Sequence, residues 1–436
     1  MSKTYTPELT PDVLERLHQY AQIFHHDFGH KRQATYNGIY LQGLLHDGER
    51  KSIEPLSRRV TLPTDLTIKA PDQALQQFVN QSPWDEQKLG TRYRKRLAET
   101  FASPKGIFLI DDSGFPKQGK HSVGVQRQYC GALGKKANCQ VAVSLHYVSP
   151  KGHYPLAMRL FLPEVWLKDK ERLDQVGVPE EFRQARTKAQ IALELLDQVR
   201  QEGLPGRVVV TDAGYGVSQD LRDGLAQREL FYLAGVTGEM VVFTEEPQWI
   251  APQAATGGRP QKCPHLAEGS PRPVSLKELA ARTPLRKVTW REGTKGKLSA
   301  RFAWRRVWPG QGWSDGDCAF ADPIWLLIEK QADGKLKYAF SNLPASTSRL
   351  RAVRLWKSRW PVEQGYQQMK EELALDHFEG RSWRGFHHHA YLVMLAYGFL
   401  VLEQLREKEH PAKPGKKGVK RRGSPYRRSV ERCRSC

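Results

Sequence analysis

The chain between Gly106 and Gly216 predicts a succession of elements that few folds accommodate. Four short apolar runs predict buried strands: GIFLIDDS (106–113), NCQVAVSLHYVS (138–149), HYPLAMRLFLP (153–163) and RVVVTDAGYG (207–216). An amphipathic helix is predicted just before the last strand, at residues 188–202. Short turns between the first three strands favour an antiparallel meander, whereas a strand that follows a helix is typically parallel. This segment therefore indicates an α/β protein.

The predicted order is three strands, then a helix, then a parallel strand, and acids lie at strand ends. An RNase H-like core has this order. The flanking sequence differs: residues before 101 show helical spacing, and residues after 240 show short alternating segments typical of strands. We therefore predict five regions. They are a helical DNA-binding or dimerisation domain (1–100), the first part of the core (101–240), a β-rich insertion (241–345), the C-terminal core helices (346–405) and a basic, disordered tail (406–436).

The chain carries a net charge of +21 over 436 residues, which points to a polyanionic partner such as nucleic acid. The residues from Arg406 onward contribute +9 of this charge, so the remaining body still carries +12. A basic tail on an otherwise ordinary enzyme is the alternative. A body that is itself basic favours the nucleic-acid partner.

Cysteine usage and hydropathy suggest a cytoplasmic protein. The six cysteines, at 130, 139, 263, 318, 433 and 436, form no pattern with the spacing of a zinc site, so we expect reduced thiols. The apolar stretch AYLVMLAYGFLVL (390–402) is too short to span a bilayer and predicts a buried core helix. The N-terminus has no apolar signal-peptide segment. We expect no membrane association and a location in the bacterial cytoplasm, near the nucleoid.

Three acids occupy positions typical of a metal site. Asp111 or Asp112 ends the first predicted strand of the core, Asp212 ends a later strand, and Glu363 opens a predicted helix. Carboxylate oxygens with room for water and phosphate suit Mg²⁺ or Mn²⁺. Two such ions can activate an attacking oxygen and stabilise the leaving one in phosphodiester transfer. Each acid alone is as typical of a turn or a helix cap.

The predicted helix that carries Glu363 begins just after Pro361, within LWKSRWPVEQGYQQMK (355–370). Tyr366, Gln367 and Lys370 follow Glu363 at helical spacing, so one face presents a carboxylate, a ring, an amide and a cation. A charged, solvated helix face has the same appearance. The alternative functional interpretation is that this face holds a metal ion and a phosphate backbone together.

The spacing of Trp356, Arg359, Glu363 and Lys370 resembles a motif of DDE transposases of the IS4 group. That motif has tyrosine at the position of Trp356, so a hydroxyl is missing here. More closely, the chain resembles IS701-type transposases. The similar segments are DDSGFPKQGKHSVGVQRQYCGALGKKANCQVAVSL (111–145), FLPEVW (161–166), TDAGYG (211–216), WREGTKGKLSARFA (290–303) and RWPVEQGYQQMKEELALDHFEGRSWRGFHHH (359–389).

The resemblance implies an RNase H-like core interrupted by a β-rich insertion, with Asp111, Asp212 and Glu363 as the catalytic triad that holds two Mg²⁺ or Mn²⁺ ions. Asp112 is the alternative first acid. Only one of the two adjacent aspartates is expected to reach the metal, because neighbouring strand residues point to opposite faces.

We expect further residues to contact DNA, either through phosphates or by stacking on bases. They are Lys117, Lys120, Trp356, Arg359, Tyr366, Lys370, Arg301 and Arg305, of which Arg359 and Lys370 follow the motif. For any one of these lysines a solvated surface position is equally consistent with the sequence. The aromatic residues, including Trp304 and Trp308, fit a core position as well. For His377 and His387–His389 we favour hydrogen bonds inside the core or to phosphate over metal ligation.

The function implied is that of a transposase, which binds the terminal inverted repeats of its element as double-stranded DNA and moves it by cut-and-paste. Water first attacks the phosphodiester at the transposon end and frees a 3′-OH, which then attacks target DNA. Two ends must be handled together, so a homodimer is expected in the protein–DNA complex. The alternatives are an RNase H-like nuclease without strand transfer and a transposase-derived DNA-binding protein without catalysis.

Overall fold

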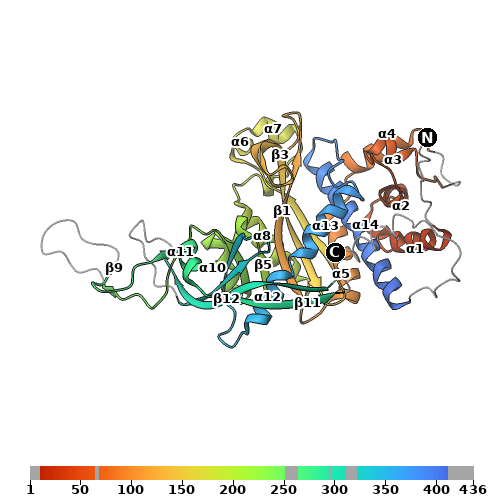
Figure 1. Ribbon diagram of the computed structural model, residues 1–436. Coiled ribbons are helices and arrows are strands. Elements are labelled where there is room, and N and C mark those ends of the chain that lie inside the picture. The colour runs from red at the N-terminus through yellow and green to blue at the C-terminus, as the bar shows by residue number, and fades with distance from the viewer. Residues whose placement is uncertain (1–9, 64–67, 251–263, 294–295, 311–321, 411–436) are drawn as a thin grey trace, which may run out of the picture. The chain divides into compact units, whose positions relative to one another are not determined.

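The computed structural model describes residues 10–63, 68–250, 264–293, 296–310 and 322–410. The predicted basic tail beyond residue 410 and four of the cysteines (263, 318, 433 and 436) lie outside these residues. The protein is a mixed α/β structure (Figure 1), as the sequence predicts. It divides into two compact units, of which the first holds residues 1–206 and 360–436 and the second residues 207–359.

The first unit begins with helices. They are α1 (Pro11–Gln22), α2 (Lys31–Leu45), α3 (Ile53–Ser57), α4 (Pro71–Asn80) and α5 (Glu86–Phe101). Side-chain caps fix where such helices start: the Asp85 carboxylate accepts from the backbone N–H groups of Gln87 and Lys88 at the start of α5. Most of these helices pack against α14 (Trp383–Glu409).

Helix α14 is the long apolar helix that the sequence predicts at residues 390–402. Within the described residues it alone is long and apolar enough to cross a membrane, and 94% of its apolar window is buried inside the protein. A helix that is apolar on all sides is typical of a protein core. The prediction of a buried core helix is therefore confirmed.

The sheet of the first unit is built on the long strand β3. One edge of β3 (Lys135–Ser149) pairs antiparallel with β1 (Ile107–Pro116). Its other edge pairs with β2 (Gln126–Cys130) and then with β4 (Gly152–Leu160). The short 3₁₀ turn η2 (Gly131–Leu133) joins β2 to β3. The predicted meander is present, with β2 as an additional strand.

Helix α8 (Lys188–Gln201) packs on β3 and β4 and begins with a capping box between Thr187 and Gln190. The short helices α6 (Glu164–Leu167) and α7 (Lys170–Gln175) and a 3₁₀ turn, η3 (Glu180–Phe182), precede it. After the second unit, helix α13 (Trp360–Glu371) continues the first unit and packs on β4.

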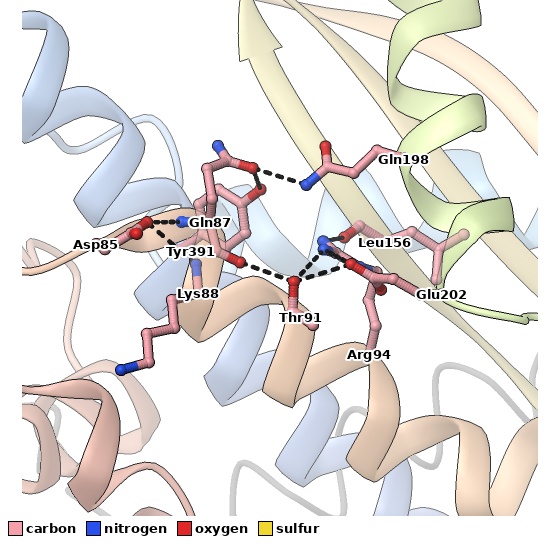
Figure 2. A network of polar contacts seen from close by, with 9 residues as sticks. All are labelled: Asp85, Gln87, Lys88, Thr91, Arg94, Leu156, Gln198, Glu202 and Tyr391. Carbon is pink, nitrogen blue, oxygen red and sulfur yellow. Dashed lines mark hydrogen bonds and ion pairs between the residues drawn. The ribbon is translucent and has the colours of Figure 1, made fainter.

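A polar network joins α5 to the end of α8 (Figure 2). The guanidinium of Arg94, which is 2% exposed, donates to both Glu202 oxygens and to the carbonyl of Leu156 on β4. Thr91 donates to the same carboxylate, and Gln198 bonds Gln87 one turn earlier. This buried ion pair is fully hydrogen-bonded, which is the condition for burying charge without a large penalty.

The second unit is a mixed sheet with helices beside it. Its strands are β5 (Val208–Thr211), β6 (Phe231–Val236), β7 (Val241–Phe243), β10 (Val274–Ser275), β11 (Arg286–Gly293), β12 (Gly296–Pro309), β13 (Ile324–Lys330) and β14 (Leu336–Ser341), and a separate pair is formed by β8 (Trp249–Ile250) and β9 (His265–Leu266). The helices are α9 (Ala213–Gly216), α10 (Gln219–Gln227), α11 (Leu276–Arg282) and α12 (Arg349–Lys357).

Strand order in this sheet is β10-β7-β12-β13-β14-β6-β5, and β11 pairs with β12. The pair β5–β6 is parallel, whereas the pairs formed among β6, β7, β10, β11, β12, β13 and β14 are antiparallel. Strands β7, β11, β12, β13 and β14 lie where the alternating segments after residue 240 predict them.

Candidate active site

Strand β1 presents its two aspartates to opposite faces of the sheet. Asp111 lies directly opposite Ser144 of β3, and Asp112 lies opposite Val143. Directly opposed residues of an antiparallel pair share a face, and consecutive residues do not. The contacts of Ser144 therefore identify the face on which Asp111 lies. The contacts of Asp112 identify the opposite face.

Asp112 faces helix α8. Its Oδ2 lies 2.8 Å from the Nζ of Lys188, at the first position of that helix. The ion pair is partly exposed, with 36% of the Lys188 side chain and 27% of the Asp112 side chain accessible. The partner of Asp112 is thus the ammonium group of Lys188. A carboxylate that binds a metal ion would have the metal in place of such a cation.

Asp111 faces helix α13. The hydroxyl of Tyr366 on α13 hydrogen-bonds the Ser144 hydroxyl, and Ser144 is the residue directly opposite Asp111. Lys370, one turn later, donates from Nζ to the carbonyl of Gly114 on β1 at 3.0 Å. Figure 1 shows α8 and α13 on the two sides of β1. Helix α13 is therefore attached to β1 and β3 on the Asp111 face.

Glu363 is exposed in the first turn of α13, one turn before Tyr366. Pro361 occupies the second position of this helix, where its missing N–H removes no intrahelical bond. Two carboxylates, Asp111 and Glu363, are thus carried by β1 and α13, which the Lys370–Gly114 hydrogen bond links directly.

A buried histidine, His146, lies against the contact between Tyr366 and Ser144. His146 Nε2 lies 2.9 Å from the Ser144 hydroxyl, and its ring centroid lies 5.1 Å from that of Tyr366. Burial lowers the pKa of His146 to about 3, so the ring is neutral at physiological pH. The ring beside the Ser144 hydroxyl is therefore uncharged.

Asp212 belongs to the second unit, at the end of the fully buried strand β5. Its Oδ1 accepts from the backbone N–H of Tyr215 and caps the short helix α9. A Cβ on Gly235 of β6 would lie 2.7 Å from the Ala213 nitrogen, so glycine allows α9 to approach the strand. The strand-end position predicted for Asp212 is present.

Two of the lysines expected to contact DNA have partners inside the protein. Lys117 Nζ donates to the carbonyl of Phe378 at 2.6 Å, and Lys370 is bonded to Gly114 as described above. Burial lowers the pKa of both lysines. Lys120, in contrast, has an exposed side chain.

Trp356 and Arg359 lie in the second unit, which ends at Arg359. Trp356 is buried, and its Nε1 donates to Glu329 on β13 at 2.8 Å. The guanidinium carbon of Arg359 lies 5.7 Å from the centre of the Trp356 ring. The aromatic residue at this motif position thus packs in the core and carries the arginine on its face.

The β-sheet of the second unit carries a row of exposed cations. Arg301 on β12 lies directly opposite Lys287 of β11 on one side and Lys330 of β13 on the other. Arg305 is half-buried on the same face, four residues further along β12. Trp304 stacks on Trp325 at 4.6 Å and donates to the carbonyl of Thr347. Like charges placed directly opposite each other destabilise a sheet, so an anion bound here would relieve the repulsion.

The three consecutive histidines of α14 lie in the core, as favoured from the sequence. His387 accepts from the backbone N–H of Leu160, and His389 bonds the Tyr40 hydroxyl. His388 stacks on Trp84 with ring centroids 3.5 Å apart. The two described cysteines, Cys130 and Cys139, are free thiols, as expected.

The donor set around Asp111 and Glu363 suits a hard divalent cation, because both side chains offer carboxylate oxygens. No group of three or more His, Cys, Asp or Glu side chains is already gathered for a metal within the described residues. A carboxylate pair that recruits water and phosphate oxygens has the chemistry of a Mg²⁺ site completed by its substrate.

Sequence reasoning missed the residues that separate the two aspartates, namely Ser144, His146 and Lys188. Each is far from residues 111–112 in the chain, and only strand register or helix packing brings it near. An available signal was the alternation of polar residues, Ser144 and His146, within an otherwise apolar strand.

Comparison with known proteins gives two matches. A family model described as DDE superfamily endonuclease matches residues 23–297, which is more than half of the chain. The match includes Asp111 and Asp212 and ends before Glu363. A protein of Microchaete diplosiphon described as a probable transposase for insertion sequence element IS701 is 31% identical over 176 residues. That alignment covers 40% of this chain and 41% of the relative, so it spans about two fifths of the relative's length.

Proposed function

Because this chain belongs to the DDE superfamily of endonucleases, we propose that it is an IS701-type transposase that cleaves and joins DNA. The observation that supports the proposal is the attachment of helix α13, with Glu363, to the paired strands β1 and β3, on the face where Asp111 lies opposite Ser144. In this proposal Asp111, Asp212 and Glu363 come together in an RNase H-like core. The helices before residue 101 form a DNA-binding or dimerisation domain, and the strands after residue 240 form an insertion.

Family membership implies divalent metal ions, usually Mg²⁺, and we propose that the three carboxylates hold two of them. The ions would neutralise charge on the phosphate as the attacking and leaving oxygens exchange. The protein's own part is to position the carboxylates and to orient the DNA. Arg359 and the cation row at Arg301 are suited to phosphate contacts, because Arg301 has like charges as its direct neighbours.

The proposed reaction has two steps at phosphorus. Water attacks the phosphodiester at the end of the element, the bond from phosphorus to the 3′ oxygen breaks, and that oxygen leaves as a 3′-OH. The freed 3′-OH then attacks a phosphodiester of target DNA, joins the strands and releases a 3′-OH of the target. The substrates are the terminal inverted repeats of the element and the target duplex, which a homodimer would hold together near the nucleoid.

Substitution of single acids tests the assignment on DNA that carries the sequences flanking this coding region. We expect Asp111→Asn, Asp212→Asn and Glu363→Gln each to lower Mg²⁺-dependent cleavage at least about a hundredfold, since losing a metal carboxylate removes several kcal/mol of transition-state stabilisation. The matched control is Asp112→Asn, which should retain cleavage, because that side chain faces Lys188. Full activity of Glu363→Gln, or loss of cleavage in Asp112→Asn alone, would contradict the assignment.

A second assay separates a transposase from a nuclease. Wild-type protein is given a pre-cleaved end with a free 3′-OH, a target duplex and Mg²⁺, and joined product is measured on a denaturing gel. Joined product supports transposition. Hydrolysis without joining would assign the same site to a nuclease.

A further inference from the structure

The β2–β3 hairpin lies within a long stretch of the chain that has no acidic residue. Residues 113–163 contain seven lysines and arginines and not one aspartate or glutamate. Three of these cations, Arg127, Lys135 and Lys136, lie on the hairpin and are exposed. Within the described part of the chain none of the three is seen in an ion pair. The hairpin is therefore a positive surface without internal neutralisation.

Two exposed apolar side chains accompany these cations at the tip. Tyr129 is 62% exposed and Leu133 is 46% exposed. Tyr129 lies directly opposite Lys136, and Arg127 precedes it by two residues on the same strand face. An exposed ring with cations on either side is typical of surfaces that stack a base and contact the adjoining phosphates.

The tip packs against β1, the strand that carries Asp111. A Cβ added to Gly114 of β1 would lie 2.8 Å from the Cys130 Sγ, so Cys130 packs on β1 at the face that Gly114 shares with Asp112. The carbonyl of this same Gly114 accepts the hydrogen bond from Lys370 of α13. The hairpin thus contacts β1, the strand of Asp111, and Tyr129, which precedes Cys130 by one residue, points to the opposite face, that of Asp111.

We propose that the tip of the β2–β3 hairpin, residues 127–136, contacts DNA next to the scissile phosphate and stacks Tyr129 on a base that has left the duplex. Arg127, Lys135 and Lys136 hold the phosphates on either side of that base. Leu133 covers its neighbour as an apolar wedge, a use of exposed apolar side chains at opened base steps. This inference rests on the proposed DNA transposase function and adds a site that recognises opened DNA.

The test measures DNA binding by the full-length chain without divalent metal, using fluorescence anisotropy. Two labelled probes are used: a blunt duplex of random sequence and the same duplex with a splayed end of unpaired thymidines. The variants are Tyr129→Ala and the double change Lys135→Gln with Lys136→Gln. The matched control is Lys151→Gln, an exposed lysine at the opposite end of β3.

We expect Tyr129→Ala to weaken binding of the splayed probe about tenfold, the effect of losing one stacked base, and to leave the blunt duplex within about twofold. The double lysine change should weaken both probes and lower the salt dependence of binding by about 1.4 to 1.8 in log–log slope. Lys151→Gln should match the wild type. Thermal unfolding of each variant checks that these surface changes leave the fold intact.

Other results overturn the proposal and remain distinct from failure of the proposed function. If both variants bind the two probes as tightly as the wild type does, the hairpin is not part of the DNA interface. Equal weakening of both probes by Tyr129→Ala removes base stacking. Unchanged DNA binding with lost self-association in sedimentation would assign the hairpin to a protein contact. A wild-type chain that binds neither probe contradicts the transposase function itself.

Discussion

At the scale of single residues, the contact between Tyr366 and Ser144 links the helix of Glu363 to β3, where Ser144 lies directly opposite Asp111. Tyr366→Phe keeps the ring against His146 and removes only the hydroxyl. We expect it to lower the free energy of unfolding by about 1 kcal/mol, the net worth of one hydrogen bond, and to raise the Mg²⁺ concentration needed for half-maximal cleavage. Urea unfolding and a Mg²⁺ titration of cleavage measure the two effects.

The control for this contact is a double-mutant cycle with Ser144→Ala. The effects of substituting two residues in direct contact should not be additive. The double variant should therefore lose less free energy of unfolding than the sum of the losses of the two single variants. Strict additivity, or an unchanged Mg²⁺ requirement in Tyr366→Phe, would show that the hydroxyl contact does not position the carboxylates.

The choice between Asp111 and Asp112 shows where sequence reasoning ends at this scale. Strand alternation predicts that the two side chains point apart, and the sequence contains nothing that says which face meets α13. The register with Ser144 and the ion pair with Lys188 supply that information. Both depend on contacts between residues more than thirty positions apart, which a single sequence does not encode locally.

At the scale of secondary-structure elements, the Arg94–Glu202 pair holds α5 against the end of α8 (Figure 2). Glu202→Gln leaves a guanidinium that is 2% exposed without its counter-ion. We expect a loss of about 3 to 5 kcal/mol in the free energy of unfolding, because breaking a buried pair strands a charge. The matched control is Glu99→Gln, which breaks the surface pair with Arg96 on the same helix and should cost less than about 1 kcal/mol. Equal losses in urea unfolding would contradict a special role for the buried pair.

The elements themselves were largely predictable where their pattern is strong. The strands β1, β3 and β4 and helix α8 follow from apolar runs and helical spacing. Strand β2 was missed because its sequence, QRQYC, pairs only at one edge and needs no apolar alternation. The short helix α9 lies where the sequence predicts only the glycine turn at the end of a strand. It was missed because its start depends on the cap formed by Asp212.

At the scale of the whole molecule, the motif that carries Glu363 lies at a division of the chain. The second unit ends at Arg359 and α13 begins at Trp360, so the motif from Trp356 to Lys370 crosses from one unit to the other. The sequence predicts a change of region between residues 345 and 346, fourteen residues before this division. The way in which the two parts of this motif associate depends on tertiary packing. The apolar and polar pattern of a single sequence does not specify that packing.

The buried histidines of the first unit predict how the protein responds to acid. Burial lowers the pKa of His146 to about 3, and of His153, His387 and His389 to about 4. An unfolded chain protonates these rings below about pH 6.5, whereas the native state leaves them neutral, so stability falls as pH falls. Burial lowers the pKa of His388 to about 3 as well. Backbone carbonyls face both of its ring nitrogens and Glu86 lies 3.7 Å away, which favours the protonated ring, so His388 is not counted with the other four.

Each of the four rings should cost about 1.4 kcal/mol per pH unit once the pH is well below 6.5, or about 5 kcal/mol per unit together. That slope is comparable with the total stability of many domains, so we expect the first unit to unfold near pH 5. Carboxylates titrate mainly below about pH 4.5, so the window from pH 6.5 to 5 isolates the histidines. Urea unfolding at half-unit pH steps measures the slope.

Two histidine variants make this prediction specific. His153→Gln keeps a polar group opposite the Tyr397 hydroxyl and should make the pH slope shallower by about one proton. His121→Gln removes an exposed histidine and should leave the slope unchanged. A stability that stays constant from pH 7 to 5 would mean that the native rings take up protons as readily as the unfolded ones. His146, which contacts the Ser144 hydroxyl and the Tyr366 ring, would then carry a positive charge in the native protein.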